Sequence, residues 1–398
     1  HAWHRASVVV SYTPVVYRVH RDGLSEEALV IYRELGKTGY RVSQLGYGAM
    51  RLPMVGEGAD ARVDREKSIP MLHAAFETGV NYVDTAHGYS NEDNQRLVGE
   101  ALKGWRDKIV ISTKNPEYND EKVWWQNLEQ ALTYLDVDYI DIYNHHGINW
   151  ERYESSVEPR LSKLMIKAKD QGLIKHICTS FHDTPENLVK LINTDYFEVI
   201  TLQYNILDRK NEDAIQLAHE KGIGIVVMGP VAGGRLGVES DVLKAMIPGV
   251  DRVPELALRF VLSNPGVSVA LSGMNTMQQV EENIATASQD LRLSDDEMQI
   301  INDQLARLQA MADLYCTGCG YCQPCPQDVN IPYIFGKYNE ARVYGLWDAA
   351  REAYQAWNRV SGKRADACVE CGECEAKCPQ HIPIIEQLIE AHEALMGA

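Results

Sequence analysis

The chain has 398 residues, 45% of them hydrophobic and 24% charged, a composition typical of globular proteins that excludes a disordered or fibrous chain. Its formal net charge of −17, with no run of lysines and arginines, argues against nucleic-acid binding and against attachment to anionic lipid. No apolar stretch approaches the ~18 residues that span a bilayer, so we expect neither nucleic acid nor a membrane among the partners.

Residues 1–30 carry no pattern that indicates a function. The apolar run from Ala6 to Val16 contains Ser11, Thr13 and Pro14, so it is a poor signal peptide. We leave this N-terminal segment unassigned.

Residues 31–292 alternate short apolar runs with amphipathic stretches. Two runs, 32–35 and 40–43, flank a glycine-containing turn and predict a hairpin that plugs one end of the fold. Apolar runs predict strands at 42–47, 81–84, 109–113, 139–143, 174–179, 199–202, 223–227 and 267–271. Helical periodicity lies between them at 67–78, 94–102, 122–134, 159–170, 186–192, 212–221 and 277–287. This alternation predicts an α/β fold, a (β/α)8 TIM barrel, rather than a doubly wound open sheet.

Polar side chains follow three neighbouring predicted strands. In a TIM barrel the reactive groups come from the C-terminal ends of the strands, because the loops there converge on one cavity. Strand two is followed by Asp84 and Tyr89, strand three ends at Lys114, and strand four ends near His146. We therefore expect these four side chains to face one another.

The chemistry of these four residues suggests proton transfer. A phenol has a pKa near 10, and an adjacent ammonium lowers it, so Lys114 could make Tyr89 a better proton donor. Asp84 would hold the ammonium, and His146 could hydrogen-bond the oxygen that is being protonated. Each residue alone has a structural alternative: a loop cap, a surface tyrosine or a solvated strand end. All four at consecutive strand ends favour a group that protonates a carbonyl oxygen as hydride reaches its carbon.

Residues 293–312 predict a helix that leads from the barrel into a smaller C-terminal domain. It begins with Ser294 as N-cap, followed by three acidic residues. We therefore place the start of the last domain near residue 313.

Cysteine is concentrated in this C-terminal domain. Only Cys178 lies elsewhere, in an apolar run where we expect a buried strand thiol. The other eight form the motifs Cys-x2-Cys-x2-Cys-x2-Cys-Pro and Cys-x2-Cys-x2-Cys-x3-Cys-Pro, with Cys316, Cys319, Cys322, Cys325, Cys368, Cys371, Cys374 and Cys378. Three closely spaced thiolates with a remote Cys-Pro are typical of [4Fe-4S] ligation. Structural zinc is the alternative, and disulfides are disfavoured because we find no export signal.

Several motifs together resemble the aldo-keto reductase superfamily over about residues 31–290. They lie at residues 33–39, 84–89, 112–114, 138–146 and 281–283. The resemblance implies a catalytic tetrad of Asp84, Tyr89, Lys114 and His146, with His145 as the weaker alternative for the histidine.

The same resemblance implies a nicotinamide dinucleotide held without a Rossmann domain. Phe181 stands where the family has an asparagine that binds the carboxamide, and residues 229–234 resemble the loop over the pyrophosphate, with a plain turn as the alternative. The implied contacts are Ser180, Gln203, Met228, Pro230, Gly233, Ser272, Gly273, Met274, Asn275, Gln279, Glu282 and Asn283. No lysine or arginine lies between Gly273 and Gln279 to hold a 2′-phosphate, so NAD(H) and NADP(H) are both candidates.

The cysteine motifs resemble bacterial two-cluster ferredoxins over residues 313–390. The resemblance implies a small α+β ferredoxin-like domain over residues 313–398 that carries two [4Fe-4S] clusters. In that family the fourth cysteine of each motif ligates the other cluster. The implied ligand sets are Cys316, Cys319, Cys322 with Cys378, and Cys368, Cys371, Cys374 with Cys325.

We interpret the chain as an aldo-keto reductase-type oxidoreductase, expected in the cytoplasm. NAD(P)H would reduce an aldehyde or ketone, or the reverse oxidation would occur, with Tyr89 as general acid and Met50 and Arg51 as candidate substrate contacts. Clusters move single electrons whereas nicotinamide moves a pair as hydride, so the clusters would serve a redox partner protein or the folding of their domain. The alternative is an iron-sulfur electron-transfer subunit whose barrel docks a partner instead of turning over carbonyls.

Overall fold

The computed structural model describes residues 30–290, 292–313, 316, 318–358, 360–379 and 381–397. The N-terminal segment that the sequence leaves unassigned therefore lies outside the described residues, apart from its last position. The chain forms two compact units: His1–Tyr204, Asp208–Met228 and Asn264–Leu291 in the first, and Asn205–Leu207, Gly229–Ser263 and Arg292–Ala398 in the second. The domain boundaries expected at residues 292 and 312 stay a prediction.

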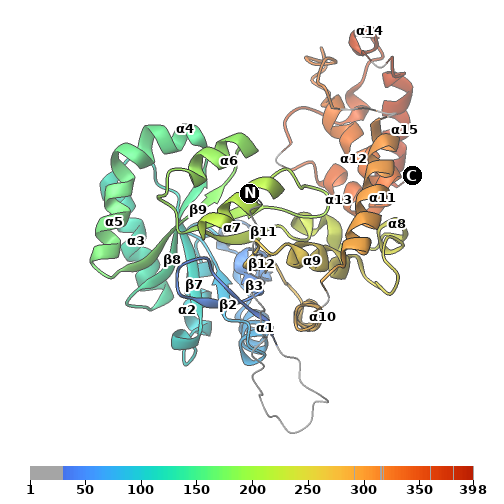
Figure 1. Ribbon diagram of the computed structural model, residues 1–398. Coiled ribbons are helices and arrows are strands. Elements are labelled where there is room, and N and C mark those ends of the chain that lie inside the picture. Colours follow the sequence, from blue (N-terminus) through green and yellow to red (C-terminus); the bar gives the residue numbers. More distant parts are fainter. Residues whose placement is uncertain are drawn as a thin grey trace, which may run out of the picture. The chain divides into compact units, whose positions relative to one another are not determined.

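The strands of the first unit close into the predicted parallel barrel (Figure 1). In order around the barrel they are β3 (Leu45–Gly48), β6 (Tyr82–Asp84), β7 (Val110–Asn115), β8 (Ile140–Ile148), β9 (Ile174–Phe181), β10 (Val199–Gln203), β11 (Gly224–Met228) and β12 (Val269–Ser272). Each overlaps one of the predicted runs. Asp84 pairs with Ser112, and Lys114 with Asn144, so the polar ends of β6, β7 and β8 lie side by side.

The predicted hairpin is present as β1 (Tyr32–Glu34) and β2 (Arg41–Ser43), which pair antiparallel. Leu35, at its turn, is fully buried in an apolar cluster that also contains residues of seven barrel strands. Gly36 has a φ of 55°, and a Cβ there would lie 2.4 Å from the Gly224 nitrogen. Only glycine fits such a close approach of hairpin and strand.

Helices follow the strands of the first unit at the predicted places. They are α1 (Arg65–Glu77), α2 (Asn94–Ala101), α3 (Glu121–Leu135), α5 (Ser162–Asp170), α6 (Pro185–Ile192), α7 (Glu212–Lys221) and α10 (Met277–Ala287). Four of them begin at a side-chain cap, because Asp64, Asp120, Thr184 and Thr276 accept hydrogen bonds from free N–H groups of the first turn.

The first unit also contains short elements that the sequence did not predict. They are β4 (Met54–Val55), β5 (Arg62–Val63), α4 (Trp150–Arg152), the π-helix η4 (Tyr153–Leu161), and the 3-10 turns η1 (Ala49–Arg51), η2 (Gly58–Asp60) and η3 (Arg106–Lys108). The helix predicted from residue 159 thus begins earlier, as a π-helix that contains Pro159. β4 and β5 form a hairpin between β3 and α1, at the end of the barrel where the polar strand ends lie.

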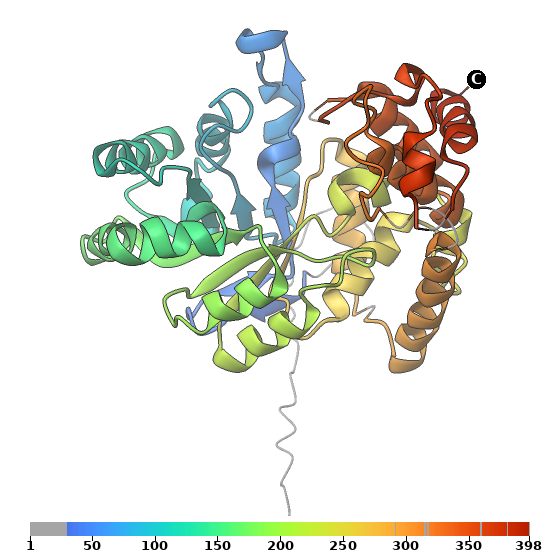
Figure 2. The same cartoon turned by 90° about the horizontal axis from the view of Figure 1, so that it is seen from above.

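The second unit is mainly helical. Its elements are η5 (Ala232–Gly237), α8 (Asp241–Lys244), α9 (Val253–Ser263), α11 (Asp295–Asp313), α12 (Ile331–Tyr344), α13 (Trp347–Ala356), η6 (Ala365–Ala367), α14 (Glu373–Lys377) and α15 (Ile384–Met396). Helices α12, α13 and α15 contact one another and lie side by side in both views (Figures 1 and 2). The β component of the expected α+β domain is, among the described residues, a single parallel bridge between Val329 and Lys363. No helix in the described part of the chain has the length and apolar character needed to cross a bilayer.

Candidate active site and cysteine pockets

A buried ion pair joins the ends of β6 and β7. The Lys114 ammonium contacts the Asp84 carboxylate and also donates to the Thr85 carbonyl oxygen at 2.8 Å. Ser112 donates from its hydroxyl to the other Asp84 oxygen at 2.8 Å. Burial alone would lower the pKa of Lys114. The carboxylate of Asp84 and the phenol of Tyr89 together raise this pKa by more than burial lowers it, so the net shift is upward and the ammonium stays charged.

Two rings lie near this ion pair: Tyr89, in the loop between β6 and α2, and His146, in β8. The Lys114 nitrogen lies 5.1 Å from the centre of the Tyr89 ring, and the Tyr89 and His146 ring centres lie 6.0 Å apart, edge to face. His145 points elsewhere: it is buried, and its Nε2 lies 3.1 Å from the Tyr196 hydroxyl. The structure therefore brings Asp84, Tyr89, Lys114 and His146 together, and leaves His145 outside the group.

The pKa of Tyr89 is raised above its usual value near 10, against the shift expected from the sequence. Burial raises it most, and the Asp84 carboxylate adds to this, whereas the Lys114 ammonium lowers it through charge and hydrogen bonding. Lys114 thus acts in the predicted direction, but the loss of water around the phenol outweighs it. At neutral pH Tyr89 carries its proton, as a proton donor must.

The two neighbouring histidines are held neutral. Burial lowers the pKa of His146 to about 4, with a further contribution from the Lys114 charge, and burial alone lowers that of His145 to about 3. Among the described residues, Nδ1 of His146 has no hydrogen-bond partner. A neutral imidazole with a free ring nitrogen can hydrogen-bond a substrate oxygen.

Because the pKa values of both histidines are lowered, we expect the folded protein to be less stable in acid. Between the unfolded pKa near 6.5 and the folded values of about 4 and about 3, the unfolded chain binds protons that the folded chain does not. The free energy of unfolding therefore falls as the pH drops from about 7 towards 4. Replacing His145 by Phe should reduce proton uptake on unfolding near pH 5 by about one proton. Thermal unfolding measured across this pH range tests it, and an unchanged pH slope would contradict it.

An unusual turn follows Tyr89. Ser90, Asn91 and Glu92 have φ values of 52°, 55° and 64°, a left-handed conformation that costs roughly 1–2 kcal/mol for each residue with a Cβ. Asn91 stabilises the turn by donating from its amide to the carbonyl oxygens of Gly58 at 2.9 Å and Ala61 at 3.1 Å. The hairpin of β4 and β5 thus holds the segment that carries Tyr89.

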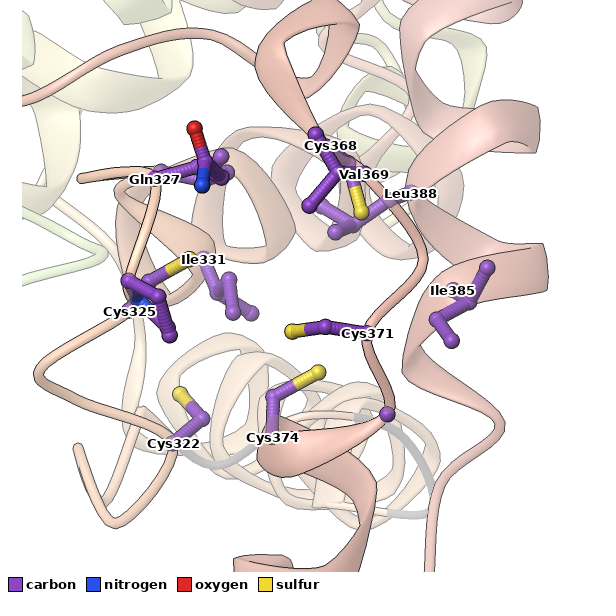
Figure 3. Close-up of a pocket in the computed structure, with 13 residues that line it drawn as sticks. Cys322, Cys325, Gln327, Ile331, Cys368, Val369, Cys371, Cys374, Ile385 and Leu388 are labelled. Carbon is purple, nitrogen blue, oxygen red and sulfur yellow. The ribbon is translucent and has the colours of Figure 1, made fainter.

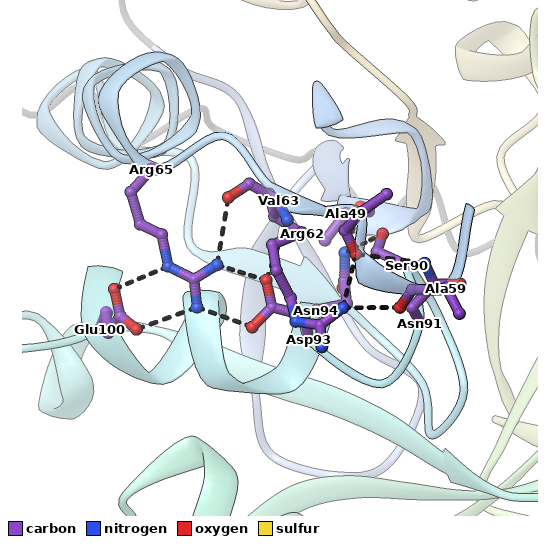
Figure 4. Close-up of polar contacts among 11 residues, drawn as sticks. Ala49, Ala59, Arg62, Val63, Arg65, Ser90, Asn91, Asp93, Asn94 and Glu100 are labelled. Atoms are coloured by element: carbon purple, nitrogen blue, oxygen red, sulfur yellow. Dashed lines mark hydrogen bonds and ion pairs between the residues drawn. The ribbon is translucent and has the colours of Figure 1, made fainter. Parts of the chain in front are cut away.

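Asn94, at the start of α2, connects three parts of this site. Its amide donates to the Ala49 carbonyl at 2.8 Å and to the Ser90 hydroxyl at 3.3 Å (Figure 4). Its oxygen accepts from the Thr85 hydroxyl at 2.6 Å. The side chain is fully buried. Asn94 therefore ties the ends of β3 and β6 to the turn after Tyr89, a role that no motif in the sequence signals.

The preceding residue anchors the same turn through charge. Asp93 accepts the Val63 N–H at 2.9 Å and pairs with the guanidinium of Arg65, which also contacts Glu100 at 3.1 Å (Figure 4). The guanidinium lowers the pKa of Asp93 below its ordinary value. The carboxylate that precedes α2 is therefore used to fix the turn rather than to cap the helix.

The eight clustered cysteines line two pockets in the second unit. One pocket is lined by Cys316, Cys319, Cys322 and Cys378, together with apolar residues of α12 and α15. The other is lined by Cys322, Cys325, Cys368, Cys371 and Cys374, and several of the sulfurs point into it (Figure 3). All eight are free of disulfides. Each pocket thus contains three cysteines of one motif and the last cysteine of the other, and Cys322 lines both pockets.

The sequence pattern of the cysteines fits a cluster better than a zinc ion. Three closely spaced thiolates with a remote Cys-Pro are the ligand pattern of [4Fe-4S] clusters, in which each thiolate binds a different iron. Burial raises the pKa of Cys322 to about 11, so a bound cation is needed to keep that ligand a thiolate.

Comparison with known proteins identifies both parts of the chain. Residues 44–306 match the model of the aldo/keto reductase family, more than half of the chain. The chain belongs to the aldo/keto reductase family. Residues 315–382, C-terminal to that match, fit the 4Fe-4S dicluster domain.

Individual relatives support this assignment. The uncharacterized oxidoreductase YqkF of Bacillus subtilis is 26% identical over 305 residues, which cover 68% of this chain and 94% of that protein. The NADH-specific methylglyoxal reductase of Escherichia coli is 24% identical over 329 residues, 69% of this chain and 98% of that protein. Among solved structures, the holo form of aldo-keto reductase AKR11C1 from Bacillus halodurans aligns with a TM-score of 0.59 and 28% identity, covering 68% of this chain and 95% of that chain.

Several residues predicted to contact a nucleotide are joined by hydrogen bonds within the reductase barrel. Ser180 accepts the Gly147 N–H at 2.8 Å, beside His146. Asn283 donates to the Ser272 hydroxyl at 3.0 Å, and the Gln279 side chain accepts the Asn275 N–H at 2.9 Å, so side-chain hydrogen bonds fix the backbone of this segment.

Other predicted contacts differ in their exposure. Gln203 and Met228, at the ends of β10 and β11, are half-buried, and Glu282 accepts from Gln278 on the surface of α10. Gly273 is exposed, whereas Met274 is fully buried and its carbonyl accepts from the Tyr47 hydroxyl at 3.0 Å. The roles predicted for these residues stay predictions.

The predicted substrate contact Arg51 lies next to the segment after β12. A Cβ on Gly273 would lie 2.9 Å from the Cγ of Arg51, so glycine at this position leaves room for the arginine. Met50 is half exposed in η1, the turn that follows β3. A cation thus stands beside the predicted adenosine segment, although that segment itself contains none.

The predicted pyrophosphate loop belongs to the second unit. Ala232, Gly233 and Gly234 have left-handed φ values of 52°, 67° and 101°, and Gly233 and Gly234 are exposed whereas Pro230 is buried. The N–H groups of Ala232 and Gly234 donate to the carbonyl oxygens of Gly229 at 2.9 Å and Val231 at 3.0 Å, so they close turns within the loop. The pyrophosphate contact that the family resemblance implies for this segment stays a prediction.

Proposed function

We propose that this protein is an NAD(P)H-dependent carbonyl reductase in which Tyr89 is the general acid. The observation that carries the proposal is the contact of a charged, buried lysine with the ring of a protonated tyrosine at the end of the barrel where the strand-end loops meet. This arrangement offers one proton at a fixed position. The family assignment and the name of the NADH-specific relative support a nicotinamide dinucleotide as the reductant.

The residues of the site divide the reaction between them. When bound, the dihydronicotinamide supplies hydride to the carbonyl carbon. Tyr89 gives its hydroxyl proton to the carbonyl oxygen, so the products are the alcohol and the oxidised nucleotide. The Lys114 ammonium stabilises the phenolate that remains, and Asp84 keeps the ammonium in place. His146, as a neutral imidazole, hydrogen-bonds the reacting oxygen and fixes its position.

We further propose two [4Fe-4S] clusters in the C-terminal domain, one for each cysteine pocket. Their ligands would be Cys316, Cys319, Cys322 and Cys378, and Cys325, Cys368, Cys371 and Cys374. The clusters would exchange electrons with a partner protein or stabilise their domain. Eight clustered thiols without disulfides suit the reducing cytoplasm, where we place the protein.

An anaerobic assay of the cluster-loaded protein tests the function. NADH and NADPH oxidation is followed at the nicotinamide absorbance with a panel of small aldehydes and ketones, and deuterium on C4 of the nucleotide should appear on the carbinol carbon. No carbonyl-dependent oxidation would contradict the proposal. Bleaching of the cluster spectrum by NADH without any carbonyl substrate would favour the electron-transfer subunit instead.

Asn94 provides a test of how Tyr89 is positioned. In an Asn94→Leu variant the turn after Tyr89 loses its bonds to Ala49, Ser90 and Thr85. We expect kcat for carbonyl reduction to fall roughly ten- to a hundredfold, because small misplacements of a catalytic group have effects of this size. KM for the nucleotide should stay unchanged.

The matched control is Asn81→Leu. Asn81 also bonds backbone through its amide, to Arg41 at 3.0 Å and Ser43 at 2.7 Å, but at the opposite end of β6. Steady-state kinetics with both variants separates positioning from stability. An equal loss of kcat in both would show that Asn94 acts only through the stability of the barrel.

A further inference from the structure

The segment that follows β11 belongs to the same compact unit as the C-terminal domain. Residues Gly229–Ser263 belong to the second unit, together with the cysteine motifs. Residues 229–234 of this segment form the predicted pyrophosphate loop, and η5 and α8 follow. What holds this segment in the second unit is therefore relevant to nucleotide binding.

An ion pair connects the segment to helix α12, which lies between the two cysteine motifs. Arg235 donates to the Glu340 carboxylate at 2.7 Å, and Lys337 holds the same carboxylate at 2.8 Å. Arg235 also donates from Nε to the carbonyl oxygen of Ala232, the first left-handed residue of the loop, at 3.3 Å. The guanidinium therefore bridges α12 and the loop.

A second contact fixes the segment at the C-terminal end of α12. The Ser240 hydroxyl donates to the Tyr344 carbonyl at 2.6 Å and accepts the Leu243 N–H at 3.2 Å, which caps α8. Ser240 is buried. Gly345 follows with a φ of 67°, and a Cβ there would lie 3.1 Å from the Ser240 hydroxyl, so the close approach favours glycine. Both ends of residues 235–240 are thus attached to α12.

The same helix forms part of both cysteine pockets. Ile331, at its start, lines both of them, and Phe335 lines one. Phe335 and Tyr338 share an apolar core with Cys322, Cys374 and Cys378. Helix α12 therefore contacts the cysteine ligands with these residues and the segment after β11 with Glu340 and Tyr344.

We propose that α12 couples the two sites: Glu340 and Ser240 are positioning residues for nucleotide binding, and the filling of the cysteine pockets sets how well they act. The inference rests on the proposed function, because it takes residues 229–234 as a nucleotide contact. A loop that is less often in its binding conformation weakens apparent affinity in proportion to the lost population. The hydride step at saturating nucleotide is not affected, because neither residue touches the reacting atoms.

The test uses the full-length, cluster-loaded protein with Glu340→Gln, Ser240→Ala and the two combined. Glu390→Gln is the matched control: Glu390, on α15, pairs with Arg342 and Tyr338 of α12 but not with the segment after β11. NADH and NADPH are titrated separately, and hydrogen exchange of residues 229–244 is measured. We expect Kd to rise about five- to tenfold in the double variant, with faster exchange in these residues and kcat within about twofold of wild type.

The outcomes separate this inference from the function on which it rests. Wild type that binds neither nucleotide would refute the proposed function. Binding by wild type with an unchanged Kd in the double variant would overturn the coupling, even if exchange became faster. A Cys378→Ala variant, with one pocket altered, should change Kd and exchange in the same direction as Glu340→Gln. If hydrogen exchange of residues 229–244 were unchanged in Cys378→Ala, the proposal that the cysteine pockets influence nucleotide binding would be wrong.

Discussion

Replacing Tyr89 by Phe is expected to abolish nearly all carbonyl reduction while nucleotide binding and iron content stay at wild-type levels. The substitution removes one oxygen from a half-buried ring and leaves the Asp84–Lys114 ion pair in place. Loss of a positioned general acid costs roughly 10²- to 10⁴-fold in rate. The measurement is single-turnover oxidation of NADH or NADPH with the best carbonyl substrate, beside nucleotide titration and iron analysis.

Tyr143→Phe is the matched control for that experiment. Tyr143 lies in β8, three residues before His146, and is fully buried. Its replacement by Phe therefore tests what the loss of a buried tyrosine hydroxyl does to the barrel without changing Tyr89. We expect activity close to wild type. Unchanged turnover in Tyr89→Phe would contradict the catalytic role and favour the alternative in which the barrel docks a redox partner.

The barrel could be predicted because its strands are buried on both faces. Such strands appear in the sequence as short continuous apolar runs, and each predicted run overlaps a strand. The predicted end of a strand was wrong where the strand carries candidate site residues. The strand predicted at 139–143 continues in the structure as β8, through Asn144, His145 and His146 to Ile148. A criterion based on apolar residues ends a strand at its functional residues, although the backbone ladder continues.

Helix α9 (Val253–Ser263) was not predicted, although its sequence is amphipathic. Glu255, Arg259 and Ser263 recur every four residues and are partly exposed, whereas Leu256 and Phe260 are buried. This spacing is the periodicity of a helix with one buried face, so the sequence did contain the signal for this helix.

The candidate active site was predictable in its membership but not in its energetics. Residue types and strand ends located Asp84, Tyr89, Lys114 and His146, since the fold brings strand ends together. The sign of the pKa shift of Tyr89 depends on how much water the folded chain removes from the phenol, and no local pattern reports this. Asn94 was missed for a related reason, because its role consists of bonds to three separate segments.

The largest expected effect in the C-terminal domain concerns which cysteines share a cluster. Cys378→Ala is expected to lower iron from about eight to about four atoms per chain and to remove the same cluster as Cys316→Ala. The reason is geometric: Cys378 lines the pocket of Cys316, Cys319 and Cys322, not that of its own motif. Iron and sulfide analysis, with paramagnetic resonance of the reduced protein, identifies the cluster that remains in each variant.

Cys325→Ala and Cys371→Ala should remove the other cluster, because both residues line the second pocket. Cys178→Ala is the control, since this thiol is buried in β9 of the barrel and far along the chain from either motif. If Cys378→Ala instead left the same spectrum as Cys371→Ala, each motif would hold its own cluster, and the crossed assignment would be wrong. Zinc without sulfide in the wild-type protein would remove both clusters from the proposal and leave the Tyr89 chemistry untouched, since that rests on the barrel alone.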